Sequence, residues 1–453
     1  MPSSTASAPS DRREDHDRIA ELATRVLGGG MGRFAARPPD RVRAALGAGV
    51  LGLIACLTLA LGFLQKSYCV RYGWGVPEVY WKACYSDLPG IAANHPLDRG
   101  LPYGAGSVVS EPVGVGMLLR LLGAFIPAEG HARLQGMFVA WAVAAALLLV
   151  VTVAATVWTC RRHPEWAAHV ALSPLVVTVA LVSTDLLGVA LTSVALLLWS
   201  RDRPTAAGVV FGLAIASRTY PILVLLAIGI LALRSGTLRS WAATAGAALV
   251  TTVVLIGGVA LFYGTATLTA YQSWATGTAQ LGSPWYLGNL SERPVQMGTL
   301  TLLTVLGWLL AVAVAGLIAL GADVRPRVAE IAIIVVVIVL VTGKALPVQA
   351  SLWLVPLVAL AGVKWRDHLI WATTEVLAFV AVWLYLGDLS VPAAALPKEW
   401  YAVLLVLRLA GLCWLAVAAG HQAWTRRAPV VEHDDVAGPM ADRPDAVVVR
   451  YER

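Results

Sequence analysis

The chain has 453 residues, of which 58% are hydrophobic and only 13% are charged, and its net charge is +7. Its mean hydropathy is +0.72, whereas soluble globular domains carry roughly a quarter charged residues. These values exclude an ordinary soluble protein and indicate an all-α polytopic membrane protein. The basic residues stand mostly in short loops and tails beside apolar segments, as the positive-inside rule describes, so nucleic-acid binding is disfavoured.

Residues 1–45 are rich in Ser, Pro, Arg and Asp and have no apolar stretch near their start, so we expect a disordered cytoplasmic tail rather than a cleaved signal peptide. The first membrane span is predicted over about 45–64. The polar loop that follows, 67–135, is too long and too rich in aromatic and charged residues to be a simple connector. Within it, 113–126 is apolar apart from Arg120 and short for a crossing, which predicts a helix at the membrane interface.

Eleven further apolar segments follow, which makes about twelve spans. They cover about 136–159, 167–182, 186–200, 205–217, 220–233, 241–263, 299–321, 328–342, 347–363, 368–386 and 400–420. The count depends on 206–233, where Arg218 interrupts the apolar run. A hairpin that turns at 217–221 puts the basic loop residues on the side of the N-terminal tail, whereas a single crossing would invert every later loop. The charge pattern favours the hairpin and leaves open whether its arms are short spans or a re-entrant pair.

This topology places both ends of the chain in the cytoplasm and the long polar loops on the outer face of the cell membrane. Residues 421–453 are acidic and contain proline, so a disordered cytoplasmic tail is expected there. The outer face carries the first loop and a second long loop over 264–298. We therefore treat 46–420 as one transmembrane domain whose working face is outside. It contains no internal repeat of the kind that marks many transporters.

Asp87 is the leading candidate for chemistry. It stands in the stretch YWKACYSDLP, beside the aromatic side chains of Trp81 and Tyr85. A carboxylate in such a loop can take a proton from an acceptor hydroxyl, because a general base needs hydrogen-bond reach and a tunable pKa. The alternative is ordinary turn chemistry before Pro89. No P-loop, HExxH, GxSxG or metal-spaced His/Cys cluster is present, so neither a metal nor a cofactor is expected.

Two of the five cysteines, Cys69 and Cys84, fall in the first loop. If this loop faces an oxidising exterior, a disulfide between them would tie the loop just before Asp87. Two unrelated free thiols are the alternative, because cysteine spacing alone is weak evidence.

Five more charged residues stand on the predicted outer face. Glu111 would bind acceptor hydroxyls or cap the interfacial helix, and Asp185 would face a cavity or cap the helix that follows it. Arg218, Lys344 and Arg293 could bind the phosphate of a lipid carrier. The alternative for each cation is a side chain that snorkels to the lipid headgroups.

Several short motifs occur in a characteristic order over about 45–420. They are Cys84-Tyr85-Ser86-Asp87, Glu111-Pro112, Ser173-Pro174 with Ser183-Thr184-Asp185, Ala216-Ser217-Arg218-Thr219-Tyr220-Pro221, Arg293-Pro294-Val295-Gln296, and Gly343-Lys344 with Gln349 and Trp353. This order resembles the membrane glycosyltransferases of the C-type fold that use polyprenyl-phosphate sugars. Within them it is similar to the actinobacterial alpha-mannosyltransferases of glycosyltransferase family 87. Arg218 stands where a Lys is more usual, and Ser183-Thr184 replace an Asn-Trp pair.

The resemblance implies a C-type fold without a required metal or cofactor, and an inverting transfer of mannose from polyprenyl-phosphate-mannose to a hydroxyl of a cell-envelope glycolipid or lipoglycan. It makes Asp87 the general base and assigns the donor phosphate to Arg218, Arg293 and Lys344. Sugar or acceptor binding is then expected from Trp81, Tyr85, Glu111, Asp185, Tyr220, Gln296 and Gln349. The expected partners are the lipid-linked donor, the glycolipid acceptor and the bilayer, and the protein is expected to be a monomer or small homo-oligomer of the inner membrane.

Other functions stay open on the sequence alone. The donor could carry arabinofuranose or glucose, and a lipid or sugar transporter or a non-catalytic envelope-assembly subunit are rivals from other classes. Composition and periodicity establish a polytopic membrane protein; the transferase assignment rests on the resemblance.

Overall fold

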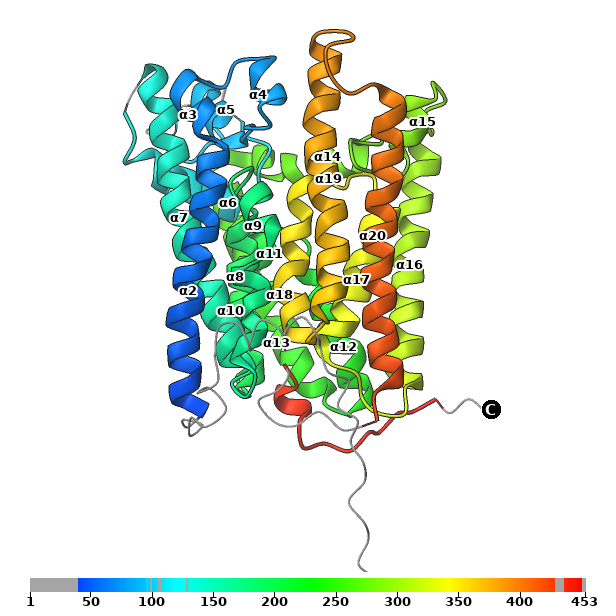
Figure 1. The fold of residues 1–453 in the computed structure, drawn as a ribbon. Coiled ribbons are helices and arrows are strands. Elements are labelled where there is room, and N and C mark those ends of the chain that lie inside the picture. The colour runs from blue at the N-terminus through cyan, green and yellow to red at the C-terminus, as the bar shows by residue number, and fades with distance from the viewer. Residues whose placement is uncertain are drawn as a thin grey trace, which may run out of the picture.

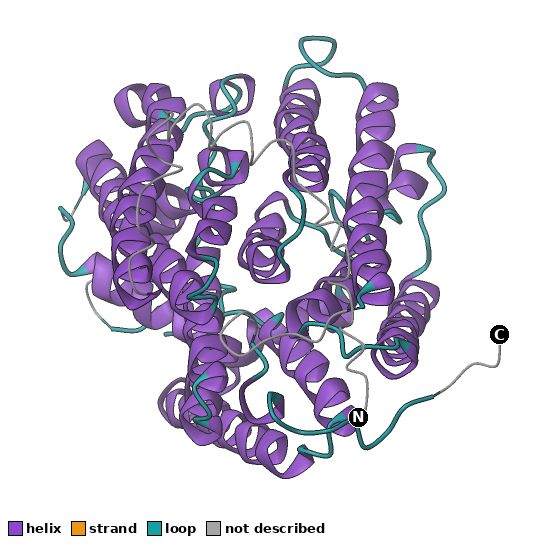
Figure 2. Cartoon of the chain, turned by 60° about the horizontal axis from the view of Figure 1, so that its bottom comes forward, coloured by secondary structure: helices purple, strands orange, loops and turns teal. Residues whose placement is uncertain are grey.

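The computed structural model describes residues 40–95, 97, 100–104, 108–127, 129–427 and 436–449, and its described part consists of helices and connecting loops without a strand (Figures 1 and 2). The prediction of an all-α polytopic membrane protein is therefore confirmed. The predicted N-terminal tail falls outside the described residues up to residue 39. The first helix already begins at Asp40, a few residues before the expected start of the first span.

Within the described chain, six helices are long and apolar enough to cross a membrane. They are α2 (Asp40–Gln65), α7 (Gly130–Thr159), α13 (Leu238–Tyr263), α16 (Met297–Gly321), α19 (Trp365–Ser390) and α20 (Lys398–Thr425). A helix of 26 residues such as α2 measures about 39 Å at about 1.5 Å per residue, which exceeds the roughly 30 Å of the hydrocarbon core. Most of these helices stand at the periphery and expose one apolar face, which suits contact with lipid.

Shorter apolar helices lie between the long ones. They are α10 (Asp185–Ser200), α11 (Pro204–Ser217), α12 (Pro221–Arg234), α17 (Val328–Thr342) and α18 (Ser351–Ala361), the last preceded by the 3₁₀ turn η4 (Val348–Ala350). The hairpin predicted at 217–221 is present as the break between α11 and α12. Pro221 starts α12, because proline fits the first turn of a helix but has no N–H with which to continue the preceding one.

The apolar stretch expected as one span over 167–182 is broken in the structure. It contains η2 (Pro164–Ala167), α8 (Ala168–Ala171) and α9 (Pro174–Val179). Pro174 ends the helical run before it, since its ring clashes with the carbonyl of the preceding turn. The fragments pack between α2 and α19, and irregular backbone is tolerated at membrane depth where protein surrounds it.

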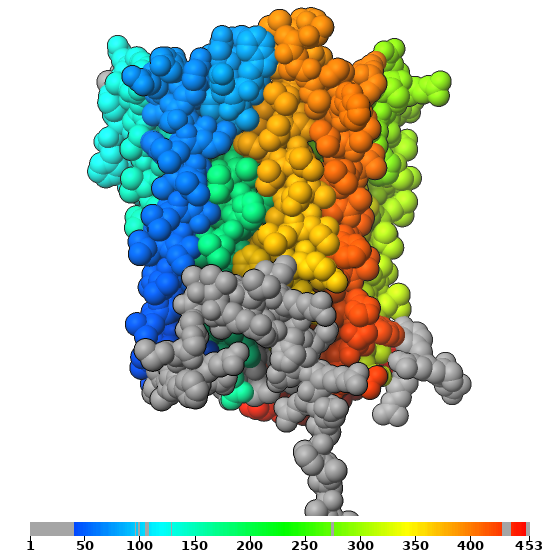
Figure 3. All heavy atoms as spheres, in the orientation of Figure 1, coloured from blue at the N-terminus to red at the C-terminus, as the bar shows by residue number. Residues whose placement is uncertain are grey.

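The first loop folds into a helical cap at one end of the bundle, which we name the Asp87 end (Figure 1). The cap contains α3 (Ser67–Tyr72), α4 (Glu78–Trp81), α5 (Asp87–Asn94) and α6 (Val113–Gly123). In the space-filling view the blue residues of this loop meet the orange end of α19 (Figure 3). The helix predicted over 113–126 is present as α6, and it packs against α11 so closely that a Cβ on Gly114 would lie 2.3 Å from Oγ of Ser217. The cap thereby becomes part of the bundle.

The second predicted loop, 264–298, reaches the same end. It contains η3 (Gly264–Leu268), α14 (Thr269–Thr276) and α15 (Tyr286–Leu290) (Figure 1). Ser283 Oγ donates to the carbonyl of Gly343 at 2.8 Å, and Trp285 Nε1 donates to that of Thr342 at 3.0 Å. The backbone N–H of Gln280 donates to the carbonyl of Lys344 at 2.9 Å. The second loop and the turn after α17 therefore form one unit.

The opposite end of the bundle carries the start of α2 and the end of α20 (Figure 1). Residues 436–449, with η5 (Gly438–Met440), lie against it. Asp445 accepts hydrogen bonds from Arg234 at 2.9 Å and from Arg325 at 2.8 Å, and Arg234 is fully buried. The structure differs here from the disordered tail expected over 421–453, because this carboxylate neutralises two arginines at the ends of the helices.

Candidate active site

Asp87 is the first residue of α5, and its position is set by two hydrogen bonds to one carbonyl. Its backbone N–H donates to Val182, just after α9, at 2.8 Å, and Ser86 Oγ donates to the same oxygen at 3.3 Å. A carboxylate in the first helical turn also interacts favourably with the helix dipole. Helix α5 has no side-chain hydrogen bond from its N-cap residue Ser86, and the two bonds to Val182 hold Asp87 at the junction of the cap and the bundle.

The segment just before Asp87 is cross-linked. Cys69 in α3 and Cys84 form a disulfide with their Cα atoms 5.9 Å apart, and both residues are buried. Cys84 lies three residues before Asp87, so the cross-link limits how far this segment can move relative to α2 and α3.

Aromatic rings form a wall beside Asp87. Trp383 of α19 stacks on Tyr85 with ring centroids 4.6 Å apart and on Tyr80 with centroids 6.2 Å apart. Trp81 belongs to the same helix as Tyr80 but packs against Gly387 of α19. Flat aromatic surfaces of this kind can stack on a sugar ring.

A cavity of about 460 Å³ opens between the cap, the 280–282 segment, the 346–349 segment, α19 and α20. Asp87, Tyr85 and Gln349 line it, together with the aromatic wall and the side chain of Arg408 from α20. Sites for small ligands are commonly clefts of roughly 300 to 1,000 Å³ with mostly apolar walls and a few placed polar groups. The cavity combines one carboxylate, one guanidinium and several aromatic rings.

One side of the cavity depends on a glycine. Gly282 has φ +83°, and a Cβ at this position would lie 2.1 Å from the carbonyl oxygen of Leu346. Tyr401 accepts a hydrogen bond from the N–H of Gly282 at 3.2 Å. A side chain would separate the second loop from the turn after α17 and would reshape the cavity.

A second charged cluster brings three predicted motifs together. Arg218, at the end of α11, donates to Glu111 at 2.5 Å and to Asp185 at 2.8 Å. Asp185 also accepts hydrogen bonds from Ser183 at 2.9 Å and from Trp353 at 2.6 Å. The ring of Trp353 stacks on that of Tyr220, with centroids 4.8 Å apart. Residues more than 100 positions apart in sequence thus form one network.

This cluster acts electrostatically on Asp87. The pKa of Asp87 is raised to about 6, mainly because the side chain is buried. A hydrogen bond with Tyr85 and the charge of Arg218 lower this pKa, whereas the carboxylates of Glu111 and Asp185 raise it. A general base works best with a pKa near the working pH. Asp87 is therefore mostly a carboxylate at neutral pH and can still accept a proton.

A comparison with known protein families identifies the family of this chain. Residues 124–348 match the model of glycosyltransferase family 87. The protein belongs to glycosyltransferase family 87. It is therefore a membrane glycosyltransferase, and the polytopic helical structure fits the C-type fold. Searches of curated proteins and of solved structures give no match.

The family match and the cavity identify different parts of this glycosyltransferase. The matched stretch contains Asp185, Arg218 and Lys344 but begins after Asp87. The family therefore establishes the class of reaction, while the position of Asp87 in the cavity comes from the structure.

The predicted phosphate-binding cations of the glycosyltransferase lie in three different settings. Arg218 is ion-paired with Glu111 and Asp185, so binding a phosphate there would require displacing a carboxylate. Lys344 is buried, and its carbonyl is tied to the cavity residue Gln280. Arg293 is exposed and does not line the cavity, and the same holds for Gln296.

Two buried cations of the glycosyltransferase were not among the predicted site residues. Lys66 is fully buried at the end of the first span and donates to the carbonyl of Tyr85, and Arg408 lines the cavity from the last span. An ionisable residue inside a membrane helix is itself a signal of function, and it could have singled out Arg408 and its partner Glu375. Lys66 had no such signal, since a lysine at the end of a span is ordinary. Among the residues that the structure describes, no group of three or more His, Cys, Asp or Glu side chains could hold a metal ion.

Proposed function

We propose that this family 87 glycosyltransferase transfers mannose, with inversion, from polyprenyl-phosphate-mannose to a hydroxyl of a cell-envelope glycolipid or lipoglycan at the outer face of the membrane. The observation that supports it is a single buried carboxylate, Asp87, in an aromatic-lined cavity at one end of the bundle. The family supplies the reaction class, and the sugar, the acceptor and the membrane face are the proposal.

In this mechanism Asp87 removes the proton from the acceptor hydroxyl. The oxygen attacks the anomeric carbon from the face opposite the phosphate, the bond from that carbon to the phosphate oxygen breaks, and the configuration inverts. A phosphate leaves as a stabilised anion and needs no protonation when cations hold it. One carboxylate is then sufficient, unlike the pair used in glycoside hydrolysis.

Two features of the cavity suit the two substrates. The stacked rings of Tyr85 and Trp383 offer a flat surface for a sugar, and Gln349 adds an amide for its hydroxyl groups. The α19 and α20 walls are largely apolar and belong to helices that cross the membrane, which suits the prenyl chain of the donor.

The cations near the cavity would stabilise the leaving phosphate. Arg408 lines the cavity and donates to the carbonyls of Leu346 at 2.6 Å and Pro347 at 3.0 Å, while its Nε donates to Glu375 at 3.0 Å. These bonds fix the turn that begins at Lys344. We therefore assign the phosphate to the Lys344 turn, which Arg408 holds in place through these bonds, and we assign Arg218 to holding Glu111 and Asp185 near Asp87.

The test is a transfer assay in nanodiscs with polyprenyl-phosphate-mannose and envelope glycolipids, run beside the arabinofuranose and glucose donors. Asp87→Asn is the catalytic variant, and Asp388→Asn is the matched control because Asp388 stands at the end of α19 and does not line the cavity. Transfer of mannose that is lost in Asp87→Asn and kept in Asp388→Asn supports the proposal. Transfer from another donor would contradict mannose as the sugar. Turnover by Asp87→Asn would contradict Asp87 as the general base.

A further inference from the structure

Lys66 is a buried lysine that no step above uses. It follows α2 directly and precedes α3, and its side chain is fully buried. Burying an ammonium group is costly, so a lysine in such a place needs compensating interactions. Its Nζ donates to the carbonyl of Tyr85 at 3.0 Å and lies 5.4 Å from the ring centroid of Phe379 in α19.

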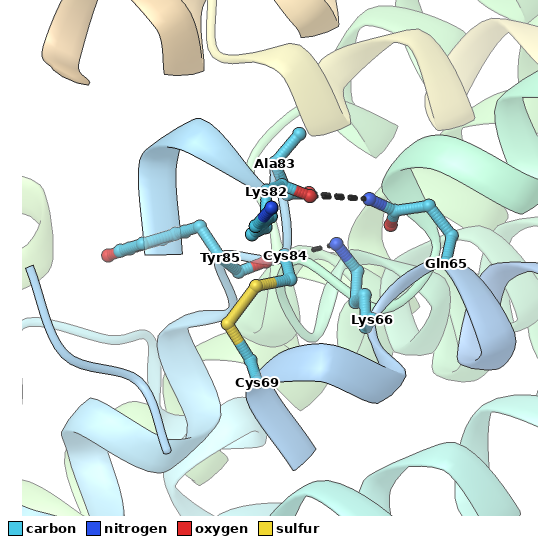
Figure 4. The surroundings of a disulfide bond; sticks show 7 residues. All are labelled: Gln65, Lys66, Cys69, Lys82, Ala83, Cys84 and Tyr85. Atoms are coloured by element: carbon cyan, nitrogen blue, oxygen red, sulfur yellow. Dashed lines mark hydrogen bonds between the residues drawn. A yellow bond between two sulfur atoms is a disulfide. The ribbon is translucent and has the colours of Figure 1, made fainter. Parts of the chain in front are cut away.

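Lys66 is part of a three-point attachment of the segment that leads to Asp87. Gln65 donates to the carbonyl of Ala83 at 2.8 Å, the Cys69–Cys84 disulfide follows, and Lys66 holds the next carbonyl, that of Tyr85 (Figure 4). The disulfide and Gln65 already tie the segment to α2 and α3. A further neutral hydrogen bond would complete this attachment without a buried charge, so the choice of lysine calls for an electrostatic reason.

That reason is the neighbouring carboxylate. Burial lowers the pKa of Lys66 to about 7, and Asp87 is the charged group that opposes this shift. Tyr85, Glu111, Asp185 and Arg218 also act on the pKa of Asp87. Of these, Glu111 and Asp185 are carboxylates that make its ionisation harder, and Arg218 is already paired with both. Lys66 is a further buried cation that interacts with Asp87, and within the described part of the chain its Nζ donates to a carbonyl and is not ion-paired with a carboxylate.

We propose that Lys66 is a positioning residue for Asp87, which fixes the Tyr85 carbonyl and, as a buried cation beside the base, keeps Asp87 ionised in mildly acidic conditions. The inference rests on the proposed function, since it takes Asp87 as the general base. Lys66 itself touches neither substrate nor reacting atoms.

The sign of the effect follows from the charges. Transfer requires the carboxylate form of Asp87, so the rate falls as the pH drops through the pKa of this group. In that range Lys66 is protonated, because its own pKa is about 7. Removing this positive charge makes ionisation of Asp87 harder. The acidic limb of the rate profile then moves to higher pH.

The experiment measures kcat/KM for transfer from about pH 5 to about pH 8 in nanodiscs, together with the melting temperature of each protein. The variants are Lys66→Met and Lys66→Gln, which remove the charge, and Lys66→Arg, which keeps it. Lys82→Met is the matched control, because Lys82 is an exposed lysine of the same loop. Lys66→Gln retains a hydrogen-bond donor and covers the case in which Lys66→Met does not fold.

We expect the acidic limb to move to higher pH by about half a unit in the two neutral variants, because an opposite charge favours the carboxylate form and one that is not in direct contact shifts the pKa by less than a direct pair does. Lys66→Arg and Lys82→Met should keep the limb of the wild type. A neutral variant that folds and loses rate with an unmoved acidic limb would overturn the proposal and leave Lys66 a structural residue. Absence of transfer by the wild type, or full activity of Asp87→Asn, would instead contradict the proposed function.

Discussion

Nε of Arg218 lies 2.8 Å from Oδ1 of Asp185, and this ion pair joins the break between α11 and α12 to the start of α10. The same guanidinium binds Glu111 from the cap, so one residue connects three separate parts of the chain. The pair is almost inaccessible to solvent, with 14% of the Arg218 side chain and 2% of the Asp185 side chain exposed. Removing one partner would leave a buried charge without compensation, which costs more than the loss of a surface salt bridge.

Arg218→Gln should lower both stability and activity. It leaves Glu111 and Asp185 without their cation, which we expect to cost about 3 kcal/mol of folding free energy. The loss of positive charge also raises the pKa of Asp87, so the acidic limb of the transfer rate should move to higher pH. Thermal unfolding and pH–rate profiles measure the two effects, and Arg239→Gln, at an exposed arginine of the opposite end, is the control. Normal melting of Arg218→Gln would show that the ion pairs contribute little.

The pKa of Asp87 predicts how the transfer rate of the wild type depends on pH. Its pKa of about 6 means that the carboxylate is lost as the pH falls below this value. The transfer rate should therefore be near its maximum at neutral pH and fall tenfold per pH unit well below pH 6. Asp87→Asn should reduce kcat by about a hundredfold or more, as expected for loss of a general base. A flat profile down to about pH 4 in the wild type would be incompatible with Asp87 as the base.

The Cys69–Cys84 disulfide should stabilise the cap. Replacing both cysteines with serine removes a cross-link across a sequence separation of 15 residues, which typically costs about 2 to 4 kcal/mol. The melting temperature of the double variant should be lower than that of the oxidised wild type and should not respond to reductant. Equal melting temperatures of the two proteins under oxidising conditions would argue against the bond.

Variants of the buried pair Arg408 and Glu375 distinguish the contribution of this pair to folding stability from its contribution to transfer activity. Both side chains are 2% exposed, and Arg408 also holds the carbonyls of Leu346 and Pro347. Arg408→Met leaves the Glu375 carboxylate unpaired, and we expect a loss of about 3 to 5 kcal/mol. Adding Glu375→Gln should restore part of the stability, because no charge then remains buried alone.

Transfer activity should not recover in this double variant, since the turn after Lys344 stays unsupported and the cavity lacks its guanidinium. Melting temperatures and kcat of the two single variants and the double variant test this. Recovery of kcat along with stability would limit Arg408 to a structural role.

The class of protein and most of the helices could be predicted from the amino-acid sequence. Apolar runs of this length have no stable position in water, so the chain must fold in a membrane, where helices satisfy the backbone internally. The hairpin at Arg218 was also predictable, because the charge pattern required it and Pro221 starts a new helix. The break before α9 was predictable in principle from Pro174, but hydropathy alone merged this stretch into one span.

Which charged residues contact one another depends on the tertiary fold. Arg218 pairs with Glu111 across 107 positions and with Asp185 across 33, and nothing local in the sequence specifies such partners. A lysine at the end of a span carries no mark of the direction it faces, so Lys66 emerged only from the packing, whereas Arg408 inside a span was detectable in the sequence as an intramembrane charge. Long-range packing places charges in a common buried environment, and that placement sets which of them pair and which carboxylate can act as a base.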